Sequence, residues 1–169
     1  MSAALHSSSE KRFWLMKSEP DVYGIEDLQR DGKEPWDSIR NYEARNFMRD
    51  QMKVGDLAFF YHSNVKPPAI VGLMEIVSEA YPDPTQFDPK NAYFDPDSSK
   101  DQPRWHLVDV AFRAKFDNPV TRDDLVVDPL LREMHLFKRN RLSITPVTQE
   151  EFLRILDLAG ADPSLFTTF

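Results

Sequence analysis

The alternation of apolar and polar residues predicts a sheet before any composition is considered. A short apolar run, Phe13 to Met16, ends at Lys17-Ser18-Glu19-Pro20, where proline removes a backbone donor from the strand ladder. A second strand, rich in aromatic residues, is predicted over Asp56 to Ser63. A third covers Ala69 to Ala80, and its segment from Val71 to Val77 is apolar enough to be buried on both faces.

The fourth predicted strand has the clearest period of two. One face carries Val108, Val110, Phe112, Ala114 and Phe116, and the other carries Asp109, Arg113 and Lys115. This pattern predicts a sheet with one solvated side and one buried side.

Helical spacing is found in fewer places. The residues from Tyr42 to Met52 place an apolar stripe opposite a basic stripe of Arg45, Arg49 and Lys53. Thr148-Gln-Glu-Glu151 is a capping box that predicts a helix ending at Gly160, with Phe152, Ile155, Leu156 and Ala159 facing inward. Shorter helices are predicted after Thr121 and from Ile25 to Arg30, the latter closed by Gly32.

Long strands with scattered short helices and no βαβ alternation favour an α+β fold with a curled sheet or a small barrel. The segment from Tyr81 to Arg104 contains five prolines, which predicts an irregular but ordered excursion or a lid. We expect one domain over residues 12–160, between a mobile, polar N-terminal tail (residues 1–11) and a weakly patterned C-terminal tail (residues 161–169).

Composition then excludes several classes of protein. The 169 residues are 41% hydrophobic and 29% charged, and no apolar run is long enough to span a membrane. The absence of cysteine excludes disulfides, thiolate metal sites and a cysteine nucleophile, and suits an intracellular protein, nuclear or cytoplasmic. The five glycines lack the spacing of a dinucleotide fingerprint or a Walker loop. With a formal net charge of −7, any contact with nucleic acid must use a local basic patch.

Metal and hydrolase chemistry find little support. No two of the four histidines lie within a helical turn of each other, and Asp95 to Asp101 only faintly matches the start of a calcium loop, because Lys100 occupies the position of the turn glycine. Ser18 and Ser63 are possible nucleophiles, but no Gly-x-Ser-x-Gly elbow is present. We therefore expect no metal, no cofactor and no catalytic residues.

Large aromatic and amide side chains occupy positions outside the predicted core. Trp36 lies in a turn-like stretch between Pro35 and Asp37, and it either binds a ligand or plugs the rim of the core. Asn41 either lines a site or caps the following helix. The run Lys138-Arg139-Asn140-Arg141 concentrates positive charge in an acidic protein, which suits contact with a few phosphates.

Several blocks of sequence resemble the EVE domain family, in order and from about Phe13 to Leu158. The blocks are Phe13 to Pro20, Trp36 with Arg40 to Asn46, Val54 to Leu57, Phe60 to Asn64, Tyr81 to Thr85, Arg104-Trp105, and Arg141 to Val147. The resemblance implies a PUA-like fold, a bent β-barrel flanked by short helices. It also implies kinship with the YTH readers of methylated adenine in RNA, and by that similarity Lys17, Ser18, Trp36 and Asn41 would line a base pocket.

The function that the resemblance implies is recognition of a modified base, with 5-methyl- or 5-hydroxymethylcytosine in DNA favoured and RNA possible. A base can be read in this way only after it leaves its stack, and an aromatic platform returns about 1–3 kcal/mol of that cost. Trp36 would be the platform, with Ser18, Asn41 and Lys17 as polar contacts. Further lining is predicted from Tyr42, Tyr61, Ser63 and Asn64, closure over the ligand from Arg104 and Trp105, and phosphate binding from Arg139 and Arg141.

Two alternatives remain open at the level of sequence. One is an RNA-binding or RNA-modifying PUA-like protein; an enzyme of this kind would act on a small nucleoside or RNA, with Glu19, Asp37 and His62 as the obvious acid or base candidates. The other is a protein-interaction module that uses the rim around Trp36. The oligomeric state is not indicated by the sequence.

Overall fold

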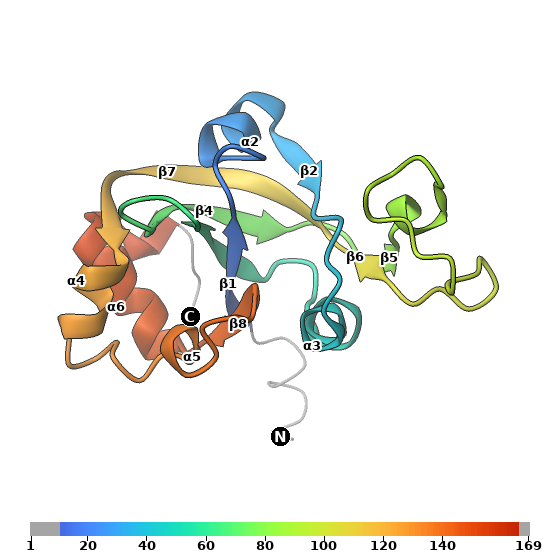
Figure 1. Ribbon diagram of the computed structural model, residues 1–169. Coiled ribbons are helices and arrows are strands. Elements are labelled where there is room, and N and C mark those ends of the chain that lie inside the picture. Colours follow the sequence, from blue (N-terminus) through green and yellow to red (C-terminus); the bar gives the residue numbers. More distant parts are fainter. Residues whose placement is uncertain (1–10, 166–169) are drawn as a thin grey trace, which may run out of the picture.

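A six-stranded mixed sheet forms the centre of the computed structural model, which describes residues 11–165 (Figure 1). The strand order is β2-β7-β4-β3-β1-β8, with β1 parallel to β3 and the other pairs antiparallel. The sheet is bent into a half-barrel, which confirms the predicted α+β class with a bent barrel and short helices. The strands are β1 (Phe13–Ser18), β2 (Lys33–Pro35), β3 (Leu57–His62), β4 (Ala69–Ile76), β7 (Asp109–Thr121) and β8 (Ile144–Val147), and β5 (Tyr81–Pro82) pairs with β6 (His106–Leu107) separately.

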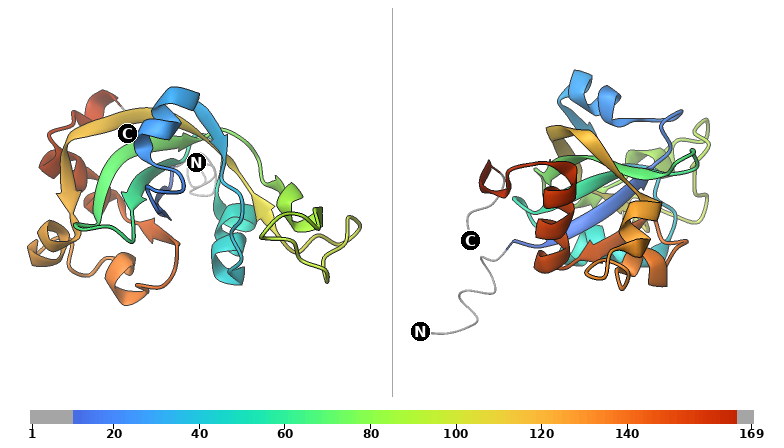
Figure 2. Two further views of the ribbon diagram at one scale, coloured as in Figure 1. Left: turned by 45° about the horizontal axis from the view of Figure 1, so that its top comes forward. Right: turned by 90° about the vertical axis from the view of Figure 1, so that its left-hand side faces the viewer.

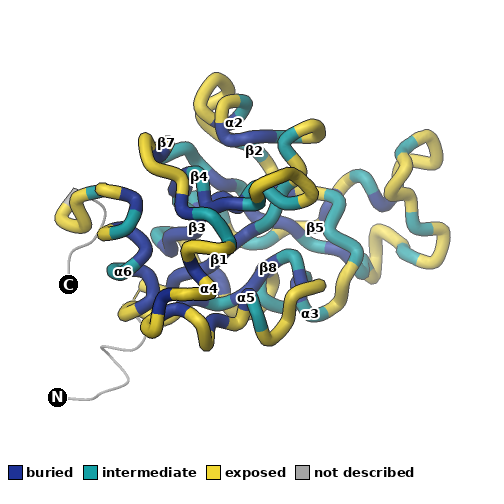
Figure 3. The backbone as a smooth tube through the Cα atoms, turned by 60° about the vertical axis from the view of Figure 1, so that its left-hand side comes forward, coloured by how far each residue is buried: buried dark blue, intermediate teal, exposed yellow. Residues whose placement is uncertain are grey.

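Short helices cover both faces of this sheet. The helices are α2 (Ile25–Asp31), α3 (Tyr42–Asn46), the π-helical turn η1 (Phe47–Gln51), the 3₁₀ turns η2 (Pro84–Phe87) and η3 (Pro163–Leu165), α4 (Arg122–Val127), α5 (His135–Lys138) and α6 (Gln149–Ala159). Figure 2 places α2 and α6 on different sides of the strands. The buried stretches follow the strands, and the exposed stretches gather in the connections (Figure 3).

Two hydrophobic cores result, one on each face of the sheet. In β1, Phe13 and Leu15 pack into the first core, where the ring of Phe13 stacks on Phe152 of α6 at 4.2 Å. Trp14 and Met16 point the other way, into a second core that contains residues of α2 and α3. The prediction that the third strand is buried on both faces is confirmed, and the prediction of one solvated face is wrong because helices cover both sides.

The predicted alternation of the fourth strand is interrupted by a β-bulge. Phe112 pairs with Met74 and Ala114 pairs with Leu73, so Arg113 is an extra residue in the register. Phe112 packs against the second core, whereas Ala114, Phe116 and Val120 face the first core. The prediction that residues 108, 110, 112, 114 and 116 share one face is therefore wrong, since a bulge reverses the direction of every later side chain.

The helix predictions hold where capping residues are present. Thr148 accepts a hydrogen bond from the Glu151 amide at the start of α6, and Gly160 ends that helix with a left-handed φ of 73°. The helices after Thr121 and before Gly32 are confirmed as α4 and α2. The helix predicted from residue 42 to 52 is divided into α3 and a π-helical turn, and the excursion over residues 81–104 is irregular apart from β5 and η2.

The predicted tails fall largely outside the residues that the structure describes. Residues 1–10 and 166–169 lie there, so both tail boundaries stay predictions. Over residues 11–165, no helix has the length and apolar character needed to cross a membrane. In the same range, no three histidine or acidic side chains gather where they could hold a metal ion.

One buried carboxylate joins β1 to β3, and removing it tests how far the fold depends on it. Asp56 accepts hydrogen bonds from the Trp14 indole (3.1 Å) and from the Arg12 and Lys53 amides (3.1 and 3.0 Å). We expect Asp56→Ala to lower the free energy of unfolding by about 2–3 kcal/mol, because these donors lose a charged acceptor. Urea denaturation measures this, with the exposed Asp50→Ala as a matched control; equal losses in both variants would contradict the prediction.

Candidate functional site

A cavity of about 500 Å³ lies between the two ends of the half-barrel. One wall comes from the end of β1 and from the segment that leads into β8. The other comes from β2 and the connection that follows it. The lining consists of residues 17–19, 22–23, 34–39, 63, 93, 140–141 and 143. This is a concave site of the size at which proteins bind small molecules.

The end of β1 fixes one wall through backbone and side-chain hydrogen bonds. The Lys17 amide donates to the carbonyl of Ser143 (2.9 Å), and its Nζ donates to the carbonyl of Asn140 (2.8 Å). Burial lowers the pKa of Lys17, and the positive charge of Arg122 lowers it further. The Ser18 hydroxyl donates to the Tyr23 carbonyl (2.6 Å), and the Ser63 amide donates to the Ser18 carbonyl (3.0 Å). These contacts bring three separate segments to one wall.

Trp36 belongs both to the second core and to the cavity lining. Its amide donates to the carbonyl of Val108 (2.9 Å), and its ring meets Phe60 edge-on with the centroids 5.5 Å apart. Only 7% of the residue is exposed, and it lines the cavity. Trp36 therefore plugs the rim of the core, as one interpretation expected, and it also borders the opening; its contact with a ligand stays a prediction.

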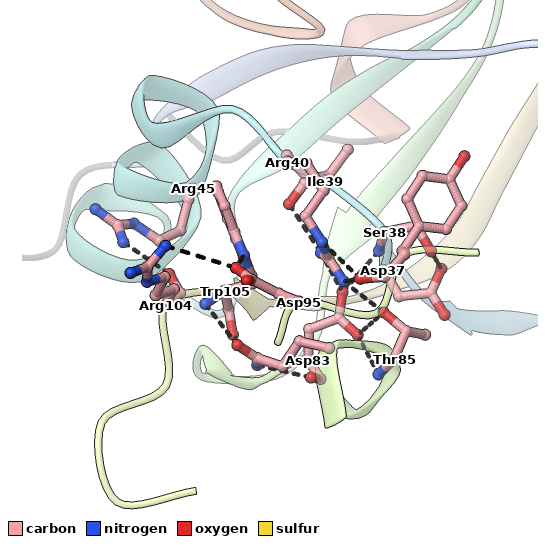
Figure 4. A network of polar contacts seen from close by, with 12 residues as sticks. Asp37, Ser38, Ile39, Arg40, Arg45, Asp83, Thr85, Asp95, Arg104 and Trp105 are labelled. Carbon is pink, nitrogen blue, oxygen red and sulfur yellow. Dashed lines mark hydrogen bonds and ion pairs between the residues drawn. The ribbon is translucent and has the colours of Figure 1, made fainter. Parts of the chain in front are cut away.

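The connection after Trp36 is held by the buried carboxylate of Asp83 (Figure 4). One oxygen accepts from the Ser38 amide (2.7 Å) and from the Arg40 guanidinium (3.2 Å), and the other accepts from the Thr85 amide and hydroxyl (2.8 and 2.6 Å). Ser38 has a positive φ of 69°, a conformation that a residue with a Cβ adopts only where its surroundings fix it. Asp83 thus determines the course of the cavity wall.

The proline-rich excursion also reaches the rim of the cavity. The guanidinium of Arg40 donates to the Tyr93 carbonyl from Nε (3.1 Å) and from a terminal nitrogen (2.7 Å). Tyr93 lines the cavity and is 48% exposed. The excursion, which projects to the right in Figure 1, therefore contributes an aromatic side chain to a site built mainly from the sheet.

The structure brings together five of the residues that the sequence assigned to binding. Four of them come from the predicted base pocket and one from the predicted phosphate site: Lys17, Ser18, Trp36, Ser63 and Arg141. Among the described residues, the Arg141 guanidinium makes no hydrogen bond or ion pair within the chain. Arg141 is thus a cation at the cavity that remains available to a ligand.

Three other assigned residues have structural partners beside the cavity. Asn41 accepts a hydrogen bond from the Ala44 amide (2.9 Å) and caps α3. Asn64 donates to the carboxylate of Glu19 (3.1 Å). Tyr61 is buried in the first core. None of these three lines the cavity, and their part in binding stays a prediction.

The remaining assigned residues form a separate cluster around α3. Tyr42 stacks on Trp105 with a centroid separation of 4.8 Å, and the Trp105 indole donates to Asp95 (2.7 Å). Arg104 lies 3.9 Å from the same carboxylate (Figure 4). Arg139 makes two hydrogen bonds to Glu43, at 2.8 and 2.6 Å. Closure by Arg104 and Trp105 and phosphate binding by Arg139 stay predictions.

The candidate acids and bases of the enzyme alternative are differently placed. Glu19 and Asp37 line the cavity, whereas Nε2 of His62 accepts a hydrogen bond from the Ile25 amide (3.1 Å) at the start of α2. Burial lowers the pKa of His62. Because Nε2 accepts this hydrogen bond, its lone pair is engaged and is not free to take up a proton.

Sequence reasoning missed several lining residues, above all Tyr23, Glu34 and Tyr93. Glu34 could have been found, because it precedes Trp36 by two positions in an extended segment and shares its face. Tyr93 could not, because its place depends on how a 24-residue irregular segment, residues 81–104, folds back through Asp83 and Arg40.

Known proteins resemble this chain over most of its length. The sequence matches the EVE domain family over residues 12–158. It is 47% identical to thymocyte nuclear protein 1 of Rattus norvegicus over 171 residues, covering 90% of this chain and 75% of that protein. A hypothetical protein from Leishmania major superimposes with a TM-score of 0.86 at 44% identity, over 89% of this chain and 96% of the other. The structure of human THYN1 protein in complex with 5-methylcytosine-containing DNA superimposes with a TM-score of 0.83 at 45% identity. The match covers 90% of this chain and 100% of that chain.

The Asp83 contacts can be tested through the amide that they hold. We expect Asp83→Ala to expose the Ser38 amide to hydrogen exchange and to lower the free energy of unfolding by about 3 kcal/mol or more, because a buried charge pair loses one partner. Asp95→Ala, which removes a carboxylate from the same excursion, is the control and should leave the Ser38 amide protected. Unchanged protection in Asp83→Ala would show that the wall does not depend on this carboxylate.

Proposed function

This chain belongs to the EVE domain family, and we propose from that premise that it is a non-enzymatic reader of a modified nucleobase. The favoured ligand is 5-methylcytosine in DNA, with 5-hydroxymethylcytosine as a close variant. The observation that carries the proposal is the complex of human THYN1 with 5-methylcytosine-containing DNA, a protein 45% identical to this chain over 90% of its length. The relatives' name, thymocyte nuclear protein, supports a nuclear location.

The cavity has the properties that a single extruded base requires. Its volume of about 500 Å³ accommodates one heterocycle, and the exposed part of Trp36 provides an aromatic surface beside it. Pro35 and Ile39 add apolar surface against which a methyl group gains by burial, at about 0.8 kcal/mol per carbon. Stacking and burial together offset the few kcal/mol that extrusion of the base costs.

The polar groups of the cavity suit a base attached to a phosphate backbone. Lys17 and Arg141 bring positive charge to the cavity of an acidic protein. Arg139 is proposed as a second phosphate contact, in which a phosphate would replace Glu43 as its partner. Binding without turnover fits the engaged lone pair of His62, which removes the strongest candidate base.

Replacement of Trp36 tests the stacking role. Because the indole also fills the second core, Trp36→Leu is preferable to alanine, since leucine retains part of the buried volume. We expect this variant to bind a 5-methylcytosine oligonucleotide about 1–3 kcal/mol more weakly than the parent. Tyr42→Ala removes an exposed aromatic ring outside the cavity and should leave the affinity nearly unchanged. Equal affinities of parent and Trp36→Leu at fixed salt would remove Trp36 from the site.

Replacement of Arg141 tests the phosphate role independently of base identity. We expect Arg141→Ala to weaken methylated and unmethylated oligonucleotides by the same factor, and to reduce the slope of log K against log salt by about 1. Arg154→Ala, which removes an arginine paired with Asp128 and Asp157 on α6, is the matched control. A salt slope that does not change in Arg141→Ala would assign that residue to another role.

Parallel titrations with DNA and RNA of the same sequence decide between the two polymers.

A further inference from the structure

A reader of 5-methylcytosine must also reject thymine, and this requirement rests on the function proposed above. The two bases carry the same methyl group on the same ring. They differ at position 4, where cytosine has an amine and thymine a carbonyl, and at N3, which is an acceptor in cytosine and a donor in thymine. Neither an aromatic platform nor an apolar wall distinguishes them. The selection must come from hydrogen-bonding groups in the cavity.

Two carboxylates line the cavity next to the indole. Glu34 lies two residues before Trp36 in extended backbone, so both side chains leave the same face of the chain. Within residues 11–165, the Glu34 carboxylate makes no hydrogen bond or ion pair. Asp37 accepts one hydrogen bond, from the Ser38 hydroxyl at 3.0 Å, through one oxygen only. This side of the cavity therefore has acceptor oxygens that lack donors from the described chain.

The other wall supplies donors, beside the carboxylate of Glu19, which accepts from Asn64 (3.1 Å). Lys17, at the end of β1, uses one of its three N–H groups on the Asn140 carbonyl, and Arg141 lies in the segment that enters β8. The half-barrel thus places acceptors from its β2 end and donors from its β8 end on a common cavity. The pairing edge of cytosine has the complementary order, with an amine donor at one end and the N3 and O2 acceptors beyond it.

We propose that Glu34 and Asp37 form an acceptor wall that receives the exocyclic amine of the base, and that these two residues determine specificity for cytosine over thymine. In thymine the O4 carbonyl would face the carboxylate oxygens, and acceptor would oppose acceptor in a partly desolvated site. The wall selects the amine and is indifferent to the methyl group. Methyl recognition belongs to the apolar residues beside Trp36.

The electrostatic state of both carboxylates agrees with this role. Burial is the main cause that raises the pKa of Glu34, and the negative charge of Asp31 raises it further. Burial likewise raises the pKa of Asp37, with Asp83 adding to the effect. Both groups are therefore less well solvated than ordinary surface carboxylates, and an incoming N–H compensates for that loss of solvation.

The backbone holds Asp37 in place before any ligand arrives. The amide of Trp36 donates to the Val108 carbonyl (2.9 Å), and the amide of Ser38 donates to buried Asp83 (2.7 Å). The residue between them has both neighbouring amides fixed. A carboxylate on a backbone fixed in this way loses little conformational entropy when a ligand binds. A contact that distinguishes cytosine from thymine needs such a fixed acceptor.

The test compares bases that differ only in the predicted contact. Single-stranded oligonucleotides with 5-methylcytosine, cytosine or thymine at one central position avoid differences in the cost of unpairing. Fluorescence anisotropy at fixed salt gives the affinities of the parent and of Glu34→Gln, Asp37→Asn and the double variant. An amide side chain keeps the size of the acid and can turn its NH₂ group toward the O4 carbonyl. Glu26→Gln is the matched control, because Glu26 carries an exposed carboxylate that does not line the cavity.

We expect the parent to bind 5-methylcytosine about tenfold or more tightly than thymine. In the double variant this ratio should fall to about threefold or less, and the single variants apportion the loss between the two residues. Glu26→Gln, which changes a carboxylate outside the cavity, should keep the ratio of the parent. Thermal unfolding of each variant establishes that it is folded. If the double variant does not fold, the binding ratios of the two single variants test the proposal instead.

The outcomes separate the two proposals. A parent that does not prefer 5-methylcytosine to cytosine contradicts the proposed function itself. A parent with that preference but equal affinity for thymine, or a double variant that retains the ratio of the parent, overturns the acceptor wall and leaves the reader function standing.

Discussion

The binding cavity depends on one buried carboxylate. The connection after Trp36 leaves the sheet, so its amides have no strand partners and must be satisfied elsewhere. Asp83 satisfies the Ser38 amide and at the same time binds Arg40 and Thr85, which joins the cavity wall to the proline-rich excursion. The excursion is therefore a structural support as well as a source of the rim residue Tyr93. Without this acceptor, Ser38 loses the amide hydrogen bond that holds its positive φ.

Trp36 shows how the site is kept rigid. A freely exposed indole would lose side-chain entropy when a base stacked on it, whereas an indole held edge-on to Phe60 has lost that entropy during folding. In the proposed function, binding and stability would share one side chain, since the ring fills the second core while it borders the cavity. Function at this position is thus limited by core packing, and only shape-conserving substitutions separate the two.

Local signals in the sequence predicted local structure well. The capping boxes of α4 and α6 are read directly from residue types, because a side chain that caps a helix acts within three residues. The bulge at Arg113 was not predictable from the sequence. One extra residue leaves no local mark on the sequence pattern, and its place is defined only by the pairing of β7 with β4. Of the site, Lys17, Ser18 and Trp36 were found through the family resemblance. Glu34 and Tyr93 were missed because bending of the sheet and folding of the excursion bring them to the cavity.

Charge is the least intuitive property of this site. A chain with a net charge of −7 repels a polyanion over most of its surface, and two more carboxylates at the binding site would weaken attraction further if phosphates approached them. The geometry separates these roles: Arg141 and Lys17 come from the β8 end of the half-barrel, and Glu34 and Asp37 from the β2 end. In the proposed complex, the phosphate of the nucleotide lies toward the cations and the exocyclic amine of the base lies toward the acids. For the proposed reader, low overall attraction would be an advantage, because weak binding to phosphates alone leaves the contacts with the base to determine occupancy.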